Sequence, residues 1–110
     1  MTPTYNRTPK NLQVINGELA VKWDDDSESF FTMERLRKAC PCATCGSETV
    51  WEHALDTETV LSDKAKNLQQ LDRIGGYAIQ PRWEDGHSTG IYSWEFLQKL
   101  EEHLKKNNLL

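Results

Sequence analysis

Three cysteines lie within six residues, at Cys40, Cys42 and Cys45, and they are the only cysteines in the chain. An odd number of cysteines crowded into one loop cannot form a balanced disulfide framework. Structural zinc takes four nitrogen or sulfur ligands, so this C-x-C-x2-C cluster needs one further donor to complete a site. The cluster therefore predicts a small domain organised around a metal-bound loop.

The chain offers three histidines as the fourth ligand. His87 is favoured because Gly86 before it permits unusual backbone angles, and because Asp85 can accept the second imidazole N–H. His53 is nearer to the cysteines in sequence, and spacing alone leaves these two candidates nearly even. His103 falls in an expected C-terminal helix, where a solvated histidine favours the negative helix end.

Two other interpretations of the cysteines remain open at this point. The cysteines can be ordinary small residues, which proteins often bury. Alternatively, Cys42 and Cys45 have the C-x-x-C spacing of redox thiols.

The length and charge of the chain restrict its class. With 110 residues it fits a single domain, and its 13 basic against 17 acidic side chains give a formal charge of −4. That balance disfavours nucleic acid as a partner. Residues 1–10 lack the apolar core of a signal peptide, and no apolar run approaches the roughly 18 residues of a membrane helix. We therefore expect a cytoplasmic protein with no membrane association.

The first half reads as a hairpin followed by a return strand and a short helix. Alternating apolar runs at 11–15 and 18–23 flank Asn16-Gly17, a strong hairpin signal. After an acidic turn, Phe30-Phe31 predicts a short returning strand, and Thr32 predicts the cap of a helix through Arg37.

The second half repeats this order more faintly. Strands are expected at 68–74 and 77–83, although Pro81 demotes the latter to an edge or a bulge, and Ser93 should cap a helix over 94–106. Residues 56–66 read as polar and exposed, and Val50 and Trp51 suit a strand. The sequence thus predicts a small single α+β domain, with short antiparallel strands and two or three helices around a metal-bound loop. Its expected parts are a flexible leader over 1–10, the domain over 11–106 and a frayed tail over 107–110.

Two motifs carry a resemblance to a known family. They are Leu36-Arg37-Lys38-Ala39-Cys40-Pro41-Cys42-Ala43-Thr44-Cys45 and Trp83-Glu84-Asp85-Gly86-His87-Ser88-Thr89-Gly90-Ile91-Tyr92-Ser93-Trp94, with Gly76-Tyr77-Ala78-Ile79 between them. With these motifs the chain resembles the gamma-butyrobetaine hydroxylase-like N-terminal domain, also known as domain of unknown function 971.

The resemblance implies a site and a function. It implies a structural zinc ion held by Cys40, Cys42, Cys45 and His87, which selects His87 over His53. In the related hydroxylases, iron(II) and 2-oxoglutarate chemistry belongs to a separate domain, and the His-x-Asp/Glu pair of that iron site does not occur here. We therefore expect a non-catalytic module with an unidentified protein partner.

The resemblance also implies an alternative. Related domains occur as free-standing proteins and fused to iron–sulfur carriers. The same cysteines could then hold iron or an iron–sulfur cluster, in an accessory of cluster assembly or of an iron/2-oxoglutarate oxidoreductase.

Overall fold

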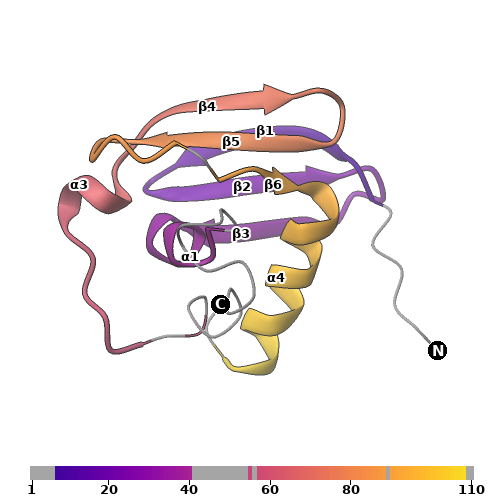
Figure 1. Ribbon diagram of the computed structural model, residues 1–110. Helices are drawn as coiled ribbons and strands as arrows, with labels where there is room; N and C mark the ends of the chain where they lie inside the picture. The colour runs from indigo at the N-terminus through magenta and orange to yellow at the C-terminus, as the bar shows by residue number, and fades with distance from the viewer. Residues whose placement is uncertain (1–6, 41–54, 56, 89, 109–110) are drawn as a thin grey trace.

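Two antiparallel sheets and three helices make up the described part of the computed structural model, which covers residues 7–40, 55, 57–88 and 90–108 (Figure 1). One sheet has the strand order β1-β2-β3 and the other β4-β5-β6. The elements are β1 (Pro9–Ile15), β2 (Glu18–Trp23), β3 (Glu28–Thr32), α1 (Met33–Lys38), α3 (Asp63–Lys66), β4 (Leu68–Ile74), β5 (Ala78–Trp83), β6 (Tyr92–Ser93) and α4 (Trp94–Lys106). The α+β class predicted from the sequence is confirmed.

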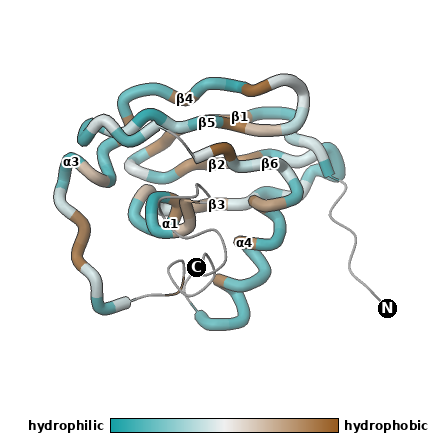
Figure 2. Tube along the Cα trace, viewed as in Figure 1, coloured by the Kyte–Doolittle hydropathy of each residue, from teal (hydrophilic) through white to brown (hydrophobic). Residues whose placement is uncertain are grey.

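The core lies between the sheets and the helices. Its largest members are Trp23, Trp83, Tyr92 and Phe31, which the strands supply at alternating positions, and α4 adds Leu97, Leu100 and Leu104. Figure 2 shows α4 as largely hydrophilic with hydrophobic positions at intervals, as expected for a helix that buries one stripe. Within the described ranges, no helix has the length and apolar character needed to cross a membrane.

The hairpin signal at Asn16-Gly17 is confirmed in detail. Asn16 has φ 51° and Gly17 has φ 77°, the left-handed pair that closes a two-residue hairpin loop with the correct twist. β2 and α4 match their predicted bounds, with Ser93 as the helix cap. β3 is longer than the expected Phe30-Phe31 pair.

Three expectations need correction. β1 begins at Pro9 inside the expected leader, because the main chain of Thr8 pairs with Asp24 (N to O 2.8 Å) and the Lys10 side chain binds Asp26. The polar stretch before residue 67 contains a short helix, α3, which Ser62 caps. β5 is the middle strand of its sheet, so the edge alternative for Pro81 is wrong, but the register with β4 does shift nearby, between Leu68 and Gln70. Pro81 is tolerated there because β6 pairs only with Ala78 and Ile79. The expected strand at Val50 and Trp51 lies outside the described residues.

The two halves repeat one architecture. In each, a hairpin ends at a buried tryptophan, an acidic turn follows, and a return strand leads into a helix. The main-chain N–H groups of the two tryptophans donate to equivalent carbonyls, from Trp23 to Ser27 (2.8 Å) and from Trp83 to His87 (3.0 Å). Asp25 and Asp85 each accept, at 3.0 Å, from the main-chain N–H two residues further on.

The equivalence extends into the helices. Both α1 and α4 begin with a hydroxyl cap, which is Thr32 in α1 and Ser93 in α4. Each of these two helices also has an i,i+4 ion pair that starts in its first turn, Glu34 with Lys38 (3.5 Å) in α1 and Glu95 with Lys99 (3.0 Å) in α4. Residues 23–27 (Trp-Asp-Asp-Asp-Ser) and 83–87 (Trp-Glu-Asp-Gly-His) occupy equivalent places in the two halves, so their short sequence match reflects a structural repeat.

The acidic turn of the first half gives a pH-dependent prediction. Lys10 Nζ lies 2.6 Å from Asp26 Oδ1, and this hydrogen bond, followed by the charge of Lys10, lowers the pKa of Asp26. A lowered folded-state pKa gives stability that is present above the unfolded pKa and is lost as pH falls through the folded pKa. We expect Asp26→Asn to melt slightly below the wild type at pH 7, and the difference to vanish at about pH 2.

Asparagine is a suitable replacement because Asp26 has φ 68°, a conformation that asparagine also accepts. Calorimetric melting at both pH values is the measurement. A difference that is unchanged at low pH would contradict the electrostatic origin.

Candidate metal centre

The turn after β5 positions His87. Trp83 is buried at the end of the strand and fixes the start of the turn, where Gly86 N–H donates to Trp83 O at 2.9 Å. Gly86 has φ 91°, so the glycine provides the backbone freedom that the sequence led us to expect. His87 therefore follows directly after a turn that a main-chain hydrogen bond closes.

The end of α1 positions Cys40. Leu36 is fully buried, and its carbonyl accepts a hydrogen bond from Tyr92 Oη at 2.6 Å, which joins α1 to β6. Beyond the C-cap Ala39, the Cys40 N–H donates to Arg37 O at 3.2 Å. Cys40 is thereby held at the helix end with only 1% of its surface exposed.

These two residues meet in the folded chain. Cys40 Sγ lies 3.1 Å from His87 Nε2, although 47 positions separate them in sequence. Of the four residues predicted as metal ligands, Cys40 and His87 are described and are brought together. Cys42 and Cys45 lie outside the described residues, as does the rival ligand His53.

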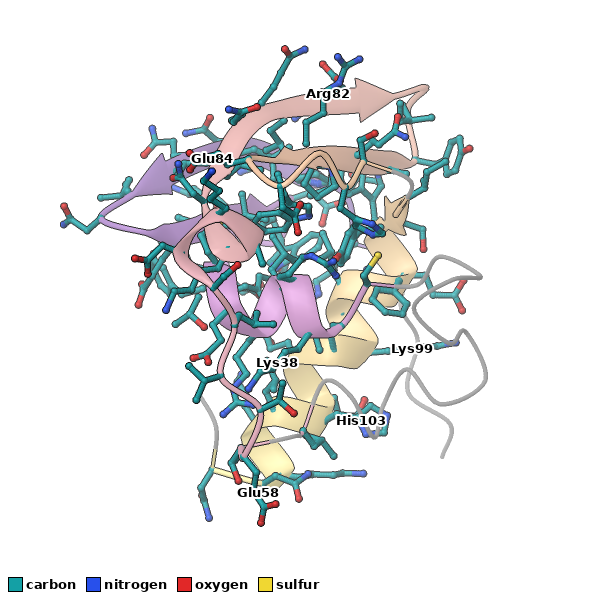
Figure 3. All side chains as sticks on the ribbon, turned by 60° about the vertical axis from the view of Figure 1, so that its left-hand side comes forward. Lys38, Glu58, Arg82, Glu84, Lys99 and His103 are labelled. Atoms are coloured by element: carbon teal, nitrogen blue, oxygen red, sulfur yellow. The ribbon has the colours of Figure 1, made fainter. Side chains whose placement is uncertain are left out.

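His103 belongs to a different part of the fold. It lies in the last turn of α4 (Figure 3), and its carbonyl accepts from Asn107 Nδ2 at 2.8 Å.

Charged groups surround the junction between α1 and the turn. Arg37 Nη2 lies 4.0 Å from Asp85 Oδ2, while Asp85 Oδ1 accepts from the main-chain N–H of His87 at 3.0 Å. The sequence predicts that Asp85 accepts a hydrogen bond from the His87 imidazole. In the structure the hydrogen bond to Asp85 comes from the main-chain N–H of His87 and shapes the turn. Asp85 therefore links α1 to the segment that carries His87.

The chemistry of the Cys40–His87 pair is compatible with soft or borderline metals. Thiolate sulfur and imidazole nitrogen are both zinc ligands, and tetrahedral coordination separates such a pair by about 3.5 Å. The observed 3.1 Å suits a sulfur–nitrogen hydrogen bond and is close to that separation. No group of three His, Cys, Asp or Glu side chains suited to a metal occurs among the described residues, which include only two of the four predicted ligands.

The equivalent junction in the other half uses hydrogen bonds. Glu101 of α4 corresponds to Cys40 when residues are counted from the two helix caps, and Ser27 corresponds to His87 when they are counted from Trp23 and Trp83. There, buried Ser29 donates to Glu101 and accepts from Trp23 Nε1 at 2.7 Å. Each helix therefore packs against the other half, one through Cys40 and one through a polar cluster.

Sequence reasoning did not identify this polar cluster. One signal was available in the sequence. Glu101 lies four positions after Leu97 and next to Leu100, so it falls on the same buried face of the helix as these leucines. Arg7 also takes part: its Nε donates to Gln98 Oε1 at 3.1 Å and its Nη1 donates to Ser27 Oγ at 2.6 Å.

Other candidate binding residues turn out to be structural. Trp23, Trp83 and Trp94 belong to the core, and Trp51 lies outside the described residues. Asp24, Asp25 and Asp26 form an exposed turn, as the sequence predicts.

Comparisons with known proteins identify both family and fold. The family model described as gamma-butyrobetaine hydroxylase-like, N-terminal matches residues 11–98. A crystal structure of a protein of unknown function from the DUF971 family of Acidithiobacillus ferrooxidans is 29% identical with a TM-score of 0.63, covering 86% of this chain and 92% of that chain.

Two NMR solution structures share the fold at lower identity. One is 23% identical with a TM-score of 0.68, covering 99% of this chain and 82% of the other; the second is 21% identical with a TM-score of 0.58, covering 91% and 77%. No curated protein matches the chain.

Proposed function

This chain belongs to the gamma-butyrobetaine hydroxylase-like, N-terminal family, and from that premise we propose that it is a non-catalytic module that holds one structural zinc ion and acts through a protein partner. The proposed ligands are Cys40, Cys42, Cys45 and His87. The zinc ion joins the loop after α1 to the turn after β5.

One observation carries the zinc proposal. Cys40 Sγ and His87 Nε2, from the two family motifs, lie 3.1 Å apart at a partly buried junction. A buried polar pair of this kind needs a physical reason, and a shared metal ion is one that also uses the neighbouring thiols. Proline has a fixed φ, and the sequence places Pro41 between the first two cysteines.

The absence of catalysis follows from a closed site. Structural zinc sites fill all four positions with protein ligands, whereas catalytic sites keep one position for water or substrate. Three cysteines and one histidine fill the shell, so the ion has no position for substrate. Its contribution is to folding, because metal-binding free energy stabilises only the folded state.

Metal content tests this proposal. Elemental analysis of purified protein should give one zinc per chain, and both Cys40→Ser and His87→Ala should lower that content to a small fraction. His103→Ala is the matched control, since it removes a histidine from α4 and should leave the zinc content unchanged.

The same experiment separates the iron–sulfur alternative. Protein purified without oxygen should be colourless. A brown sample with stoichiometric iron and sulfide would overturn the zinc assignment and favour a role in cluster handling.

A further inference from the structure

A hollow of about 590 Å³ lies where the start of α1 faces the start of β4. Apolar side chains of Val14, Met33 and Leu68 line it together with the carboxylates of Glu34, Asp63 and Glu84. We call it the α1–β4 hollow. Glu84 lies beside α3 at this side of the molecule (Figure 3).

The internal repeat shows what fills the equivalent place in the other half. Thr32 and Ser93 are equivalent caps, so Met33 corresponds to Trp94. The strand registers pair Val14 with Leu19 and Arg73 with Ile79, four residues before the equivalent tryptophans in each half, so Val14 corresponds to Arg73.

In the second half these two positions form a stacked pair. The guanidinium carbon of Arg73 lies 5.9 Å from the ring centroid of Trp94, within the range of cation–π attraction. The indole Nε1 donates to Gly76 O at 2.8 Å, and Trp94 is only 6% exposed. In the first half, valine and methionine provide neither the ring nor the cation.

The charges around the hollow complement a cation. Three carboxylates line it against one ammonium group, that of Lys66, and the whole chain carries −4. Lys38 is paired with Glu34 at 3.5 Å and Asn67 Nδ2 donates to Glu84 at 2.7 Å, so the protein holds two of the three carboxylates in place. Like the arginine in the other half, a basic group here would lie beside an aromatic ring.

We propose that the α1–β4 hollow binds a protein partner through an exposed aromatic side chain flanked by a lysine or arginine. The partner's ring takes the place that Trp94 holds in the second half, over Val14 and Met33, and its cation faces Glu34, Asp63 and Glu84. An aromatic anchor in a pocket with adjacent charge is a common way for a small surface to gain binding energy and specificity. This inference rests on the interaction part of the proposed function and is independent of zinc.

The test is an NMR titration of the full chain with the tripeptide Lys-Trp-Lys, and with Glu-Trp-Glu and Lys-Ala-Lys as comparisons. We expect Lys-Trp-Lys to shift the amide signals of Gly17, Thr32 and Leu68, and to bind about tenfold more tightly than either comparison peptide. Equal binding of Glu-Trp-Glu, shifts confined to other surfaces, or no shift at millimolar peptide would overturn the proposal.

A variant copied from the other half sharpens the test. Met33→Trp fills the hollow from within and should weaken Lys-Trp-Lys binding about tenfold or more, with an otherwise unchanged spectrum. Asp63→Asn should weaken it less, and Tyr77→Ala, which trims an exposed ring on the opposite hairpin, should leave it unchanged. Retained affinity in Met33→Trp would contradict the location.

Zinc content, measured on the same samples, keeps the two proposals apart. A zinc-loaded protein that does not bind Lys-Trp-Lys would overturn only the proposed partner site. A metal-free protein that binds the peptide would overturn only the zinc site.

Discussion

Removing the metal with a chelator, or replacing His87 with alanine, should lower the thermal midpoint of this protein by roughly 10 °C or more. If zinc binds as proposed, the expected loss in unfolding free energy is about 3 kcal/mol, because the ion would cross-link two segments that lie far apart in the sequence. Cys40 directly follows the C-cap of α1 and His87 belongs to the turn after β5, so both segments would lose their common anchor. Calorimetry on samples of verified metal content is the measurement.

The effect should also be local. Hydrogen exchange should increase at the end of α1 and in the turn of residues 84–87, while the helix α4 stays protected through its own cluster. His103→Ala should melt as the wild type does. An unchanged thermal midpoint after verified metal loss would contradict a structural role for the ion.

Truncating Trp23 to alanine should destabilise the domain by about 3–5 kcal/mol. Trp23 is fully buried, its Nε1 donates to Ser29 Oγ at 2.7 Å, and the Arg7 guanidinium carbon lies 5.1 Å from its ring centroid. The substitution leaves a cavity and removes a donor from the buried cluster that joins β3 to α4. Urea unfolding followed by circular dichroism measures the loss.

Trp23→Phe separates packing from hydrogen bonding. It keeps most of the ring volume but removes the indole N–H, so we expect a smaller loss of about 1–3 kcal/mol. A Trp23→Ala variant within about 1 kcal/mol of the wild type would show that the first half tolerates loss of its central side chain.

The two junctions explain why the repeated halves hold together. α1 is joined to the second half through Arg37 with Asp85 and through Cys40 with His87, while α4 is joined to the first half through Gln98 with Arg7 and through Glu101 with Ser29. If the first junction depends on zinc, as proposed, the halves have one metal-dependent and one metal-independent connection. The chelation experiment tests this difference, because only the connection through Cys40 and His87 should weaken when the metal is removed.

Much of the local structure followed from the sequence because the signals are local. Asn16-Gly17 predicts its hairpin from the backbone angles that only such residues adopt readily, and Ser93 predicts the start of α4 from its capping hydroxyl. The short helix α3 was missed, since four residues offer too little periodicity to recognise. Of the two alternatives that Pro81 offered, the edge is wrong, because a missing neighbour at one residue does not make the whole strand an edge.

The sequence by itself determined most of the strands, the starts of α1 and α4, the α+β class and, through the resemblance, His87 as the candidate fourth ligand. Only the tertiary structure decided that α1 packs across the other half, so that Cys40 Sγ and His87 Nε2 lie 3.1 Å apart, and that one half keeps a hollow where the other carries Trp94. The physical reason is the distance along the sequence between the residues that interact. Caps, turns and alternation depend on neighbouring residues, whereas the partners of a helix face depend on how two separately formed sheets pack together.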